Sequence, residues 1–202
     1  MDEQEQIAAA QRGSLGAFND LVRTYEQRVF NLSYRMLGDR EAAADATQET
    51  FLSAYRALDR FRGGSFKAWL LRIAANACYD QLRVLQRRPT QSLDHMLSHD
   101  DGEDTALDLP SHDRTTDPED RALQSELSRE IQQALAQLPP DQRLALILLD
   151  VHGLSYDEIA GATNTNLGTV KSRISRARYK MRDLLLGRGE LLQGHPRPIS
   201  EG

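Results

Sequence analysis

The sequence GLSYDEIA at residues 153–160 and the sequence GTVKSRISRAR at residues 168–178 form the most informative part of this chain. Ser155 can cap a short helix, and the polar residues between the two sequences can form a turn. A longer helix then places Val170 and Ile174 on one apolar stripe. Two helices joined by such a turn have the spacing of a helix-turn-helix motif.

The second helix of this motif is predicted to expose a polar and basic side. A helix of this width fits the major groove of DNA, with its N-terminal side chains at the edges of the bases. The pattern therefore indicates DNA binding. The residues predicted on the exposed side are Lys171, Ser172, Ser175, Arg176 and Tyr179.

Three more helices are predicted in the first 90 residues. Apolar residues recur at steps of three and four between Ser14, which is suited to an N-cap, and Gly38, which is suited to a helix end. Asp39 can cap a second helix, which ends before Arg62. Ser65 can start a third helix with an apolar stripe of its own.

Two further helices are predicted ahead of the helix-turn-helix motif. One spans Leu123–Leu138 and ends at Pro139 and Pro140. Asp141 is predicted to cap the next, which runs to Val151. No segment alternates between apolar and polar residues over more than a few positions, so we predict an all-α fold.

Charge is distributed unevenly along the 202 residues, although 25 Lys and Arg against 30 Asp and Glu leave a formal net charge of only -5. The segment Thr90–Asp120 holds ten acidic residues and one basic residue. A stretch so acidic and so poor in aromatic residues cannot bury enough apolar surface to offset its ordering entropy. We therefore predict two small helical domains joined by a flexible acidic linker. The predicted limits are 1–89 for the N-terminal domain, 90–118 for the linker, 119–188 for the C-terminal domain and 189–202 for a tail.

Several classes of protein are excluded by composition. No apolar run approaches the roughly 20 residues that cross a bilayer, and the N-terminus lacks the features of a secretory signal. Cys78 is the single cysteine, so no internal disulfide forms. No CxxC or HExxH spacing indicates a metal site. We expect a cytoplasmic protein without membrane insertion, metal or cofactor.

The chain resembles the extracytoplasmic-function sigma factors of bacterial RNA polymerase. The helix-turn-helix sequence is similar to their region 4. DATQETFLSAY at residues 45–55, FRG at 61–63 and FKAWLLRIAAN at 66–76 are similar to their region 2. A helix-turn-helix alone is a weak signal, but two matches in the right order cover nearly the whole chain.

This resemblance implies roles for residues in the N-terminal domain. Asp45, Gln48 and Glu49 lie within one helical turn and correspond to the patch that the family uses against the β′ clamp coiled coil; a solvated helix face is the alternative. The residues implied in binding the -10 strand are Phe61, Lys67, Arg72, Asn76 and Arg83. An aromatic ring can stack on an unpaired base, an amide can read its edge, and the basic side chains can hold phosphates.

In the C-terminal domain the resemblance implies contacts to the -35 element. The residues expected there are Thr169, Lys171, Ser172, Arg173, Ser175 and Arg176. For Arg173 and Arg178 two roles stay open, a contact to a DNA phosphate and a salt bridge within the protein. Leu149, Thr163 and Thr165 depart from the family pattern, so no particular -35 sequence can be carried over.

The implied function is that of an initiation subunit without enzymatic activity. Its expected partners are core RNA polymerase, through the β′ clamp coiled coil and the β flap, promoter DNA and an anti-sigma factor. The alternative is a repressor or activator that acts without core polymerase, but the net charge of -5 and the acidic linker disfavour tight binding of free DNA. The linker itself is either a solvated spacer or an anionic segment that competes with DNA phosphates for the basic faces of the two domains.

Overall fold

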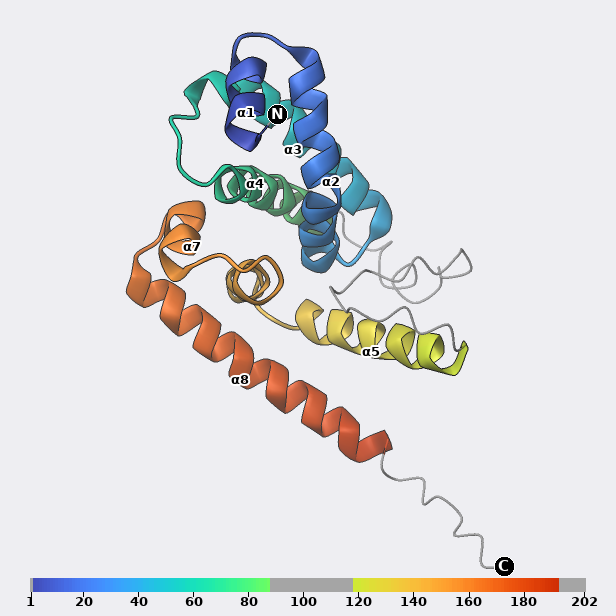
Figure 1. Ribbon diagram of the computed structural model, residues 1–202. Helices are drawn as coiled ribbons and strands as arrows, with labels where there is room; N and C mark the ends of the chain where they lie inside the picture. Colours follow the sequence, from blue (N-terminus) through green and yellow to red (C-terminus); the bar gives the residue numbers. More distant parts are fainter. Residues whose placement is uncertain (1, 88–117, 193–202) are drawn as a thin grey trace, which may run out of the picture.

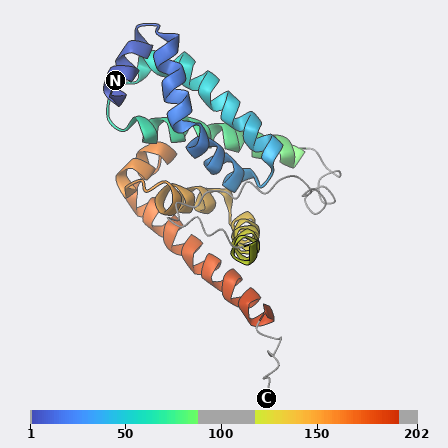
Figure 2. The same ribbon diagram turned by 45° about the vertical axis from the view of Figure 1, so that its right-hand side comes forward.

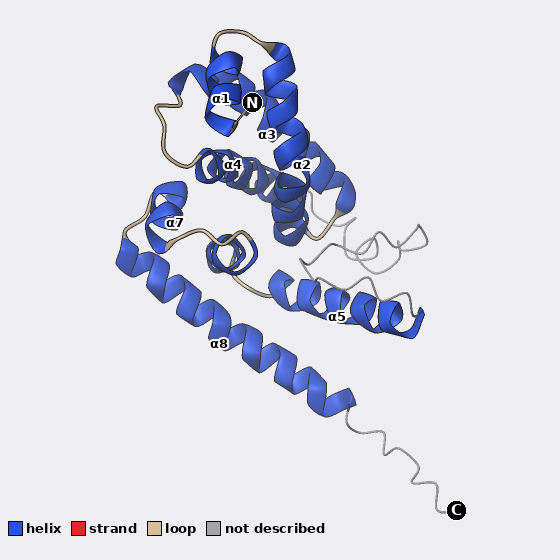
Figure 3. Cartoon of the chain, viewed as in Figure 1, coloured by secondary structure: helices blue, strands red, loops and turns tan. Residues whose placement is uncertain are grey.

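The computed structural model describes residues 2–87 and 118–192, and their regular elements are all helical (Figure 1, Figure 3). The all-α prediction is therefore confirmed. The N-terminal domain consists of α1 (Glu3–Gln11), α2 (Leu15–Leu37), α3 (Arg40–Ala57), a short 3-10 turn η1 (Leu58–Arg60) and α4 (Phe66–Arg87). The C-terminal domain consists of α5 (Pro118–Ala136), α6 (Pro140–Leu146), a π-helical segment η2 (Ile147–Val151), α7 (Tyr156–Thr163) and α8 (Leu167–Leu192).

The predicted linker and tail fall mostly on residues that the structure does not describe. Of the linker 90–118, only Pro118 is described, as the first residue of α5. Helix α8 continues to Leu192, so residues 189–192 of the predicted tail are helical, and the rest of the tail lies outside the described residues.

Local capping explains where the main helices of the N-terminal domain begin and end. The Ser14 hydroxyl accepts the Ala17 N–H at 3.3 Å at the start of α2. Gly38 ends that helix with φ 77°, in the left-handed region that glycine adopts without strain. A carboxylate oxygen of Asp39 then accepts the Ala42 N–H at 2.7 Å and starts α3. These three sequence predictions are confirmed.

Two local features differ from the sequence predictions. Helix α1 was not predicted, because its only buried residues are Ile7 and Ala10; Asp2 and Glu5 form a capping box at its start. Asp141 does not cap α6, whose N-cap position is Pro139. The Asp141 carboxylate lies in the first turn of α6, where it is available for an ion pair.

The two helical domains pack against each other and share one apolar core (Figure 1, Figure 2). The C-terminal part of α2 contacts α5, α6 and η2, and α4 contacts α7. Helix α7 lies between α4 and α8. The sequence predicted the two domains, but not this packing.

Candidate nucleic-acid interface

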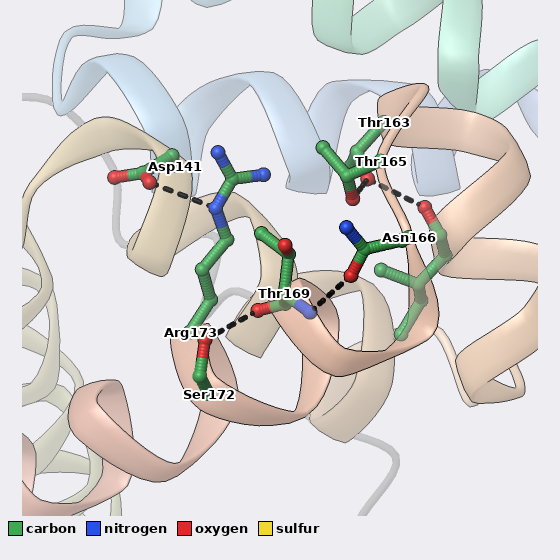
Figure 4. Close-up of polar contacts among 8 residues, drawn as sticks. Asp141, Thr163, Thr165, Asn166, Thr169, Ser172 and Arg173 are labelled. Atoms are coloured by element: carbon green, nitrogen blue, oxygen red, sulfur yellow. Dashed lines mark hydrogen bonds and ion pairs between the residues drawn. The ribbon is translucent and has the colours of Figure 1, made fainter.

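The turn between α7 and α8 is held by its own polar side chains (Figure 4). The Thr163 hydroxyl donates to the Ile159 carbonyl at 2.7 Å and lies 2.9 Å from the Thr165 hydroxyl. Asn164 adopts φ 50° and ends α7, and the Asn166 side chain accepts the Thr169 N–H at 2.8 Å at the start of α8. The two threonines that depart from the family pattern therefore satisfy each other within the turn.

Helix α8 presents a polar side to solvent because its apolar stripe is buried. Val170 and Ile174 are almost fully buried against the rest of the C-terminal domain. Lys171, Ser175 and Arg176 are exposed, as predicted. Thr169 and Ser172 are half-buried, and the Ser172 hydroxyl donates to the Thr169 carbonyl at 2.9 Å.

Two arginines of α8 form ion pairs with the preceding helices. The Arg173 Nε lies 2.8 Å from the Asp141 carboxylate, and the Arg173 side chain is only 23% exposed (Figure 4). Arg178 donates to the Asp150 carboxylate at 2.5 Å, and this hydrogen bond raises the Arg178 pKa. Arg173 was predicted to contact DNA, with salt bridging as the alternative; in this structure its guanidinium pairs with Asp141.

The exposed side of α4 carries three of the residues predicted to bind the -10 strand. Arg72, Asn76 and Arg83 are exposed, and their spacing of four and seven places them on one side of the helix. Arg83 also pairs with Asp80 at 2.7 Å. Lys67 differs, because it is half-buried and its Nζ donates to a backbone carbonyl of the C-terminal domain.

Phe61, which is predicted to bind the -10 strand, has its ring packed against other aromatic side chains in this structure. It follows η1 and is only 9% exposed. Its ring centroid lies 5.5 Å from that of Phe66 and 5.3 Å from that of Trp69. The Gln11 side chain also donates to the Phe61 carbonyl at 2.9 Å. Phe61 therefore belongs to the aromatic core that positions the start of α4.

Helix α3 carries the acidic patch predicted to bind core polymerase. Asp45, Gln48 and Glu49 are all exposed. The opposite side of the helix is buried, and the Thr47 and Thr50 hydroxyls donate to backbone carbonyls of α3. The structure thus brings the three predicted residues together on one accessible face.

An apolar groove lies beside this patch, and sequence reasoning missed it. It has a volume of about 850 Å³ and runs between α2 and α3. Among its lining residues, Leu15, Leu52 and Tyr55 are large apolar side chains left exposed. Leu15 and Tyr55 belong to the apolar patterns of α2 and α3, and nothing in that periodicity shows that they stay exposed. Gln48 belongs both to the groove and to the acidic patch.

No helix within residues 2–87 or 118–192 combines the length and apolar character that a membrane crossing requires. Within the same residues, no group of three or more His, Cys, Asp or Glu side chains is arranged to hold a metal ion.

Comparison with known proteins identifies the family. The Sigma-70 region 2 model matches residues 21–88, and the Sigma-70, region 4 model matches residues 128–181. The RNA polymerase sigma-H factor of Pseudomonas aeruginosa is 39% identical over 181 residues, which are 87% of this chain and 90% of that protein. The chain belongs to the extracytoplasmic-function sigma factors. This sigma factor therefore directs promoter-specific transcription initiation by RNA polymerase.

Two other relatives agree with this assignment. The sigma factor is 35% identical to ECF RNA polymerase sigma factor SigE of Mycolicibacterium smegmatis over 178 residues, 88% of this chain and 65% of that protein. It is 38% identical to the ECF RNA polymerase sigma-E factor of Escherichia coli over 180 residues, 88% of this chain and 91% of that protein.

Among solved structures, CnrH in complex with the cytosolic domain of CnrY matches with a TM-score of 0.65 at 27% identity, covering 92% of this chain and 99% of that one. RpoE in complex with the anti-sigma factor NepR from Bartonella quintana matches with a TM-score of 0.61 at 28% identity, covering 83% and 96%. In this sigma factor, the region 2 match includes α3 and α4, and the region 4 match includes α7 and the first half of α8.

Proposed function

We propose that this sigma factor acts in the cytoplasm as a non-enzymatic subunit that uses three separate surfaces. The α3 patch and its groove bind the β′ clamp coiled coil, the exposed side of α4 holds the -10 strand, and the exposed side of α8 reads the -35 element. The proposed domain limits are 1–89 and 119–188, and the second domain also contacts the β flap. The observation that carries the proposal is that each surface lies exposed on its own helix.

Co-elution with purified core polymerase tests this proposal directly. The full chain is expected to shift to the elution volume of the polymerase in size-exclusion chromatography. Elution at its own volume, with DNA binding retained, would instead favour a regulator that acts without core polymerase.

The groove beside the α3 patch fits an amphipathic helix of the core enzyme. Leu52 and Tyr55 offer apolar contacts inside the groove, and Asp45 and Glu49 offer negative charge along α3. A helix with an apolar side and a basic edge would bury Leu52 and Tyr55 and bring its basic edge close to the two carboxylates. The acidic patch would then set the orientation of the bound helix, and the groove would supply the apolar contact area.

A protein partner of a different kind is suggested by the solved structures. CnrH and RpoE were solved with CnrY and with the anti-sigma factor NepR. We extend this to the present sigma factor and propose that an anti-sigma factor also binds it.

Asn76 is proposed to read an unpaired base of the -10 strand, with Arg72 and Arg83 on neighbouring phosphates. Asn76→Ala is expected to reduce transcription from a duplex promoter about tenfold or more, because the amide that donates to and accepts from the base edge is lost. A template with a pre-melted -10 bubble should restore part of the activity, since unpairing no longer depends on the protein. The measurement is run-off transcription on both templates.

Asn19→Ala is the matched control for this experiment, because Asn19 is an exposed asparagine of the same domain, on α2. It should leave transcription unchanged on both templates. Equal defects of Asn76→Ala on duplex and bubble would contradict a role in opening and indicate a role in docking or folding.

Arg176 is proposed to contact a base edge in the -35 element, whereas Arg178 is held by Asp150. Arg176→Ala is expected to cost about 1 to 3 kcal/mol at particular -35 positions and to relax the preference there. Arg178→Ala should weaken DNA binding by a similar factor for all -35 sequences. Selection from a randomised -35 library measures both, and an unchanged preference in Arg176→Ala would show that Arg176 reads no base.

A further inference from the structure

The C-terminal end of α2 is capped by side chains of the C-terminal domain. The last carbonyls of a helix have no partner within the helix. Here the Gln132 amide nitrogen donates to the Tyr34 carbonyl at 3.1 Å and to the Arg35 carbonyl at 3.3 Å. The Arg143 guanidinium donates to the Met36 carbonyl. Two side chains from the other domain therefore bind three successive carbonyls, of which that of Tyr34 also accepts the Gly38 N–H at 2.8 Å.

Arg143 also joins this helix end to a second one. Its guanidinium donates to the Ala136 carbonyl at 2.7 Å and to the Leu138 carbonyl at 3.1 Å, where α5 ends. The residue is only 8% exposed. A cation between the C-terminal ends of two helices is favoured by both helix dipoles. The contact is therefore a buried bridge between the domains rather than a surface ion pair.

The same interface is held at a second point, at the start of α4. Lys67 Nζ donates to the His152 carbonyl at 3.0 Å. His152 is half-buried, and the partial burial of its ring, together with the charges of Arg35, Lys67 and Arg28, lowers its pKa to about 4, so the ring is neutral at neutral pH. The domains are thus fastened at two points of their contact, and Lys67, which the sequence predicts to bind the -10 strand, is engaged at one of them.

In this packing the proposed DNA-binding helices lie too close together to span a promoter. Helix α7 separates α4 from the start of α8 (Figure 1). Packed helices lie at about 10 Å between axes, which places α4 and the start of α8 at about 20 Å. By their names the -10 and -35 elements lie about 25 base pairs apart, which is roughly 85 Å at about 3.4 Å per base pair. The domains must separate before both elements can be bound.

We propose that Gln132 and Arg143 form a latch on the end of α2, which holds the sigma factor in a closed form that cannot engage both promoter elements. The proposal rests on the function proposed above, since it concerns how the same surfaces are made available. Core polymerase binds the two domains at separate sites and therefore selects the open form. If only a small fraction of the molecules is open, the apparent affinity for the polymerase equals the affinity of the open form multiplied by that fraction.

Gln132→Glu tests the latch with little change of shape. The substitution replaces the donating nitrogen by a second oxygen, which then faces the Tyr34 and Arg35 carbonyls. We expect the ratio of open to closed form to rise at least about tenfold, or about 1.4 kcal/mol. Gln132→Ala removes the hydrogen bonds without the repulsion and should have a smaller effect in the same direction. Gln124→Glu makes the same change at an exposed position of α5 and serves as the control.

Domain separation can be measured in the full chain by fluorescence energy transfer. Dyes on Gln4→Cys in α1 and Asp183→Cys in α8 would report the distance between the domains, because the two positions lie in different domains and both are exposed. Cys78 is fully buried and its pKa is raised to about 11 by burial, so it does not compete for the dyes. Titration with core polymerase gives the apparent affinity of each variant.

The latch predicts that Gln132→Glu moves the dyes apart and tightens apparent binding of core polymerase about tenfold, while Gln124→Glu does neither. Unchanged energy transfer in both Gln132→Glu and Gln132→Ala would overturn the latch, whatever the affinity for the polymerase. Failure of the proposed function would show differently: the dyes would separate in Gln132→Glu, but neither that variant nor the parent would bind core polymerase.

Discussion

Lysine at both Asp45 and Glu49 is expected to weaken binding of core polymerase about a hundredfold. Both carboxylates lie on the exposed face of α3, beside the apolar groove. Reversing two charges at an interface turns attraction into repulsion and raises the cost of docking. A hundredfold loss corresponds to about 2.7 kcal/mol, which is a moderate cost for two reversed charges.

The fold should tolerate this double substitution. Glu49 contacts Arg56 at 3.8 Å, but both side chains are largely exposed, and such pairs contribute little to stability. Circular dichroism should therefore be unchanged, while the affinity for core polymerase is measured by titration. Asp59→Lys combined with Glu126→Lys changes the net charge equally at two other exposed positions. If the α3 variant bound as tightly as this control, the α3 patch would not be the contact surface.

Phe66→Ala is expected to lower the free energy of unfolding by about 3 to 5 kcal/mol. Phe66 is 2% exposed and begins α4. Its ring centroid lies 5.5 Å from those of Tyr25 and Phe61 and 5.3 Å from that of Trp69. Alanine would leave a cavity among three aromatic rings, which come from α2, from the residue that follows η1 and from α4.

Denaturant unfolding followed by circular dichroism measures this loss. Tyr179→Ala is the control, because Tyr179 is 66% exposed and packs only loosely beside Arg182. Its effect should stay below about 1 kcal/mol. A loss below 1 kcal/mol in Phe66→Ala would show that the aromatic cluster does not hold the start of α4.

Local features of the fold could be predicted because they depend on residues a few positions apart. The caps at Ser14, Asp39 and Ser155 each bind a backbone N–H three residues further on. The apolar stripe of α8 follows from helical periodicity alone. Helix α1 was missed because it buries only Ile7 and Ala10, which leaves little periodic signal.

The surroundings of single site residues could not be predicted where they depend on distant partners. Phe61 was expected to stack on an unpaired base, and in this structure its ring packs against those of Phe66 and Trp69. Arg173 was divided between a DNA contact and a salt bridge, and in this structure it pairs with Asp141 in a different helix. Nothing in the spacing of either residue distinguishes a free side chain from an engaged one, because the partner lies outside the local pattern.

Most of the helices, the helix-turn-helix motif and the exposed polar sides of α3, α4 and α8 could be predicted, since each follows from residues within a few turns of one helix. The way in which the two domains meet depends instead on the tertiary structure. Gln132, Arg143 and Lys67 bind carbonyls 85 to 107 residues away in the chain. Any backbone carbonyl can accept such a hydrogen bond, so the choice of partner carries no sequence signature and depends on the packed arrangement of the helices.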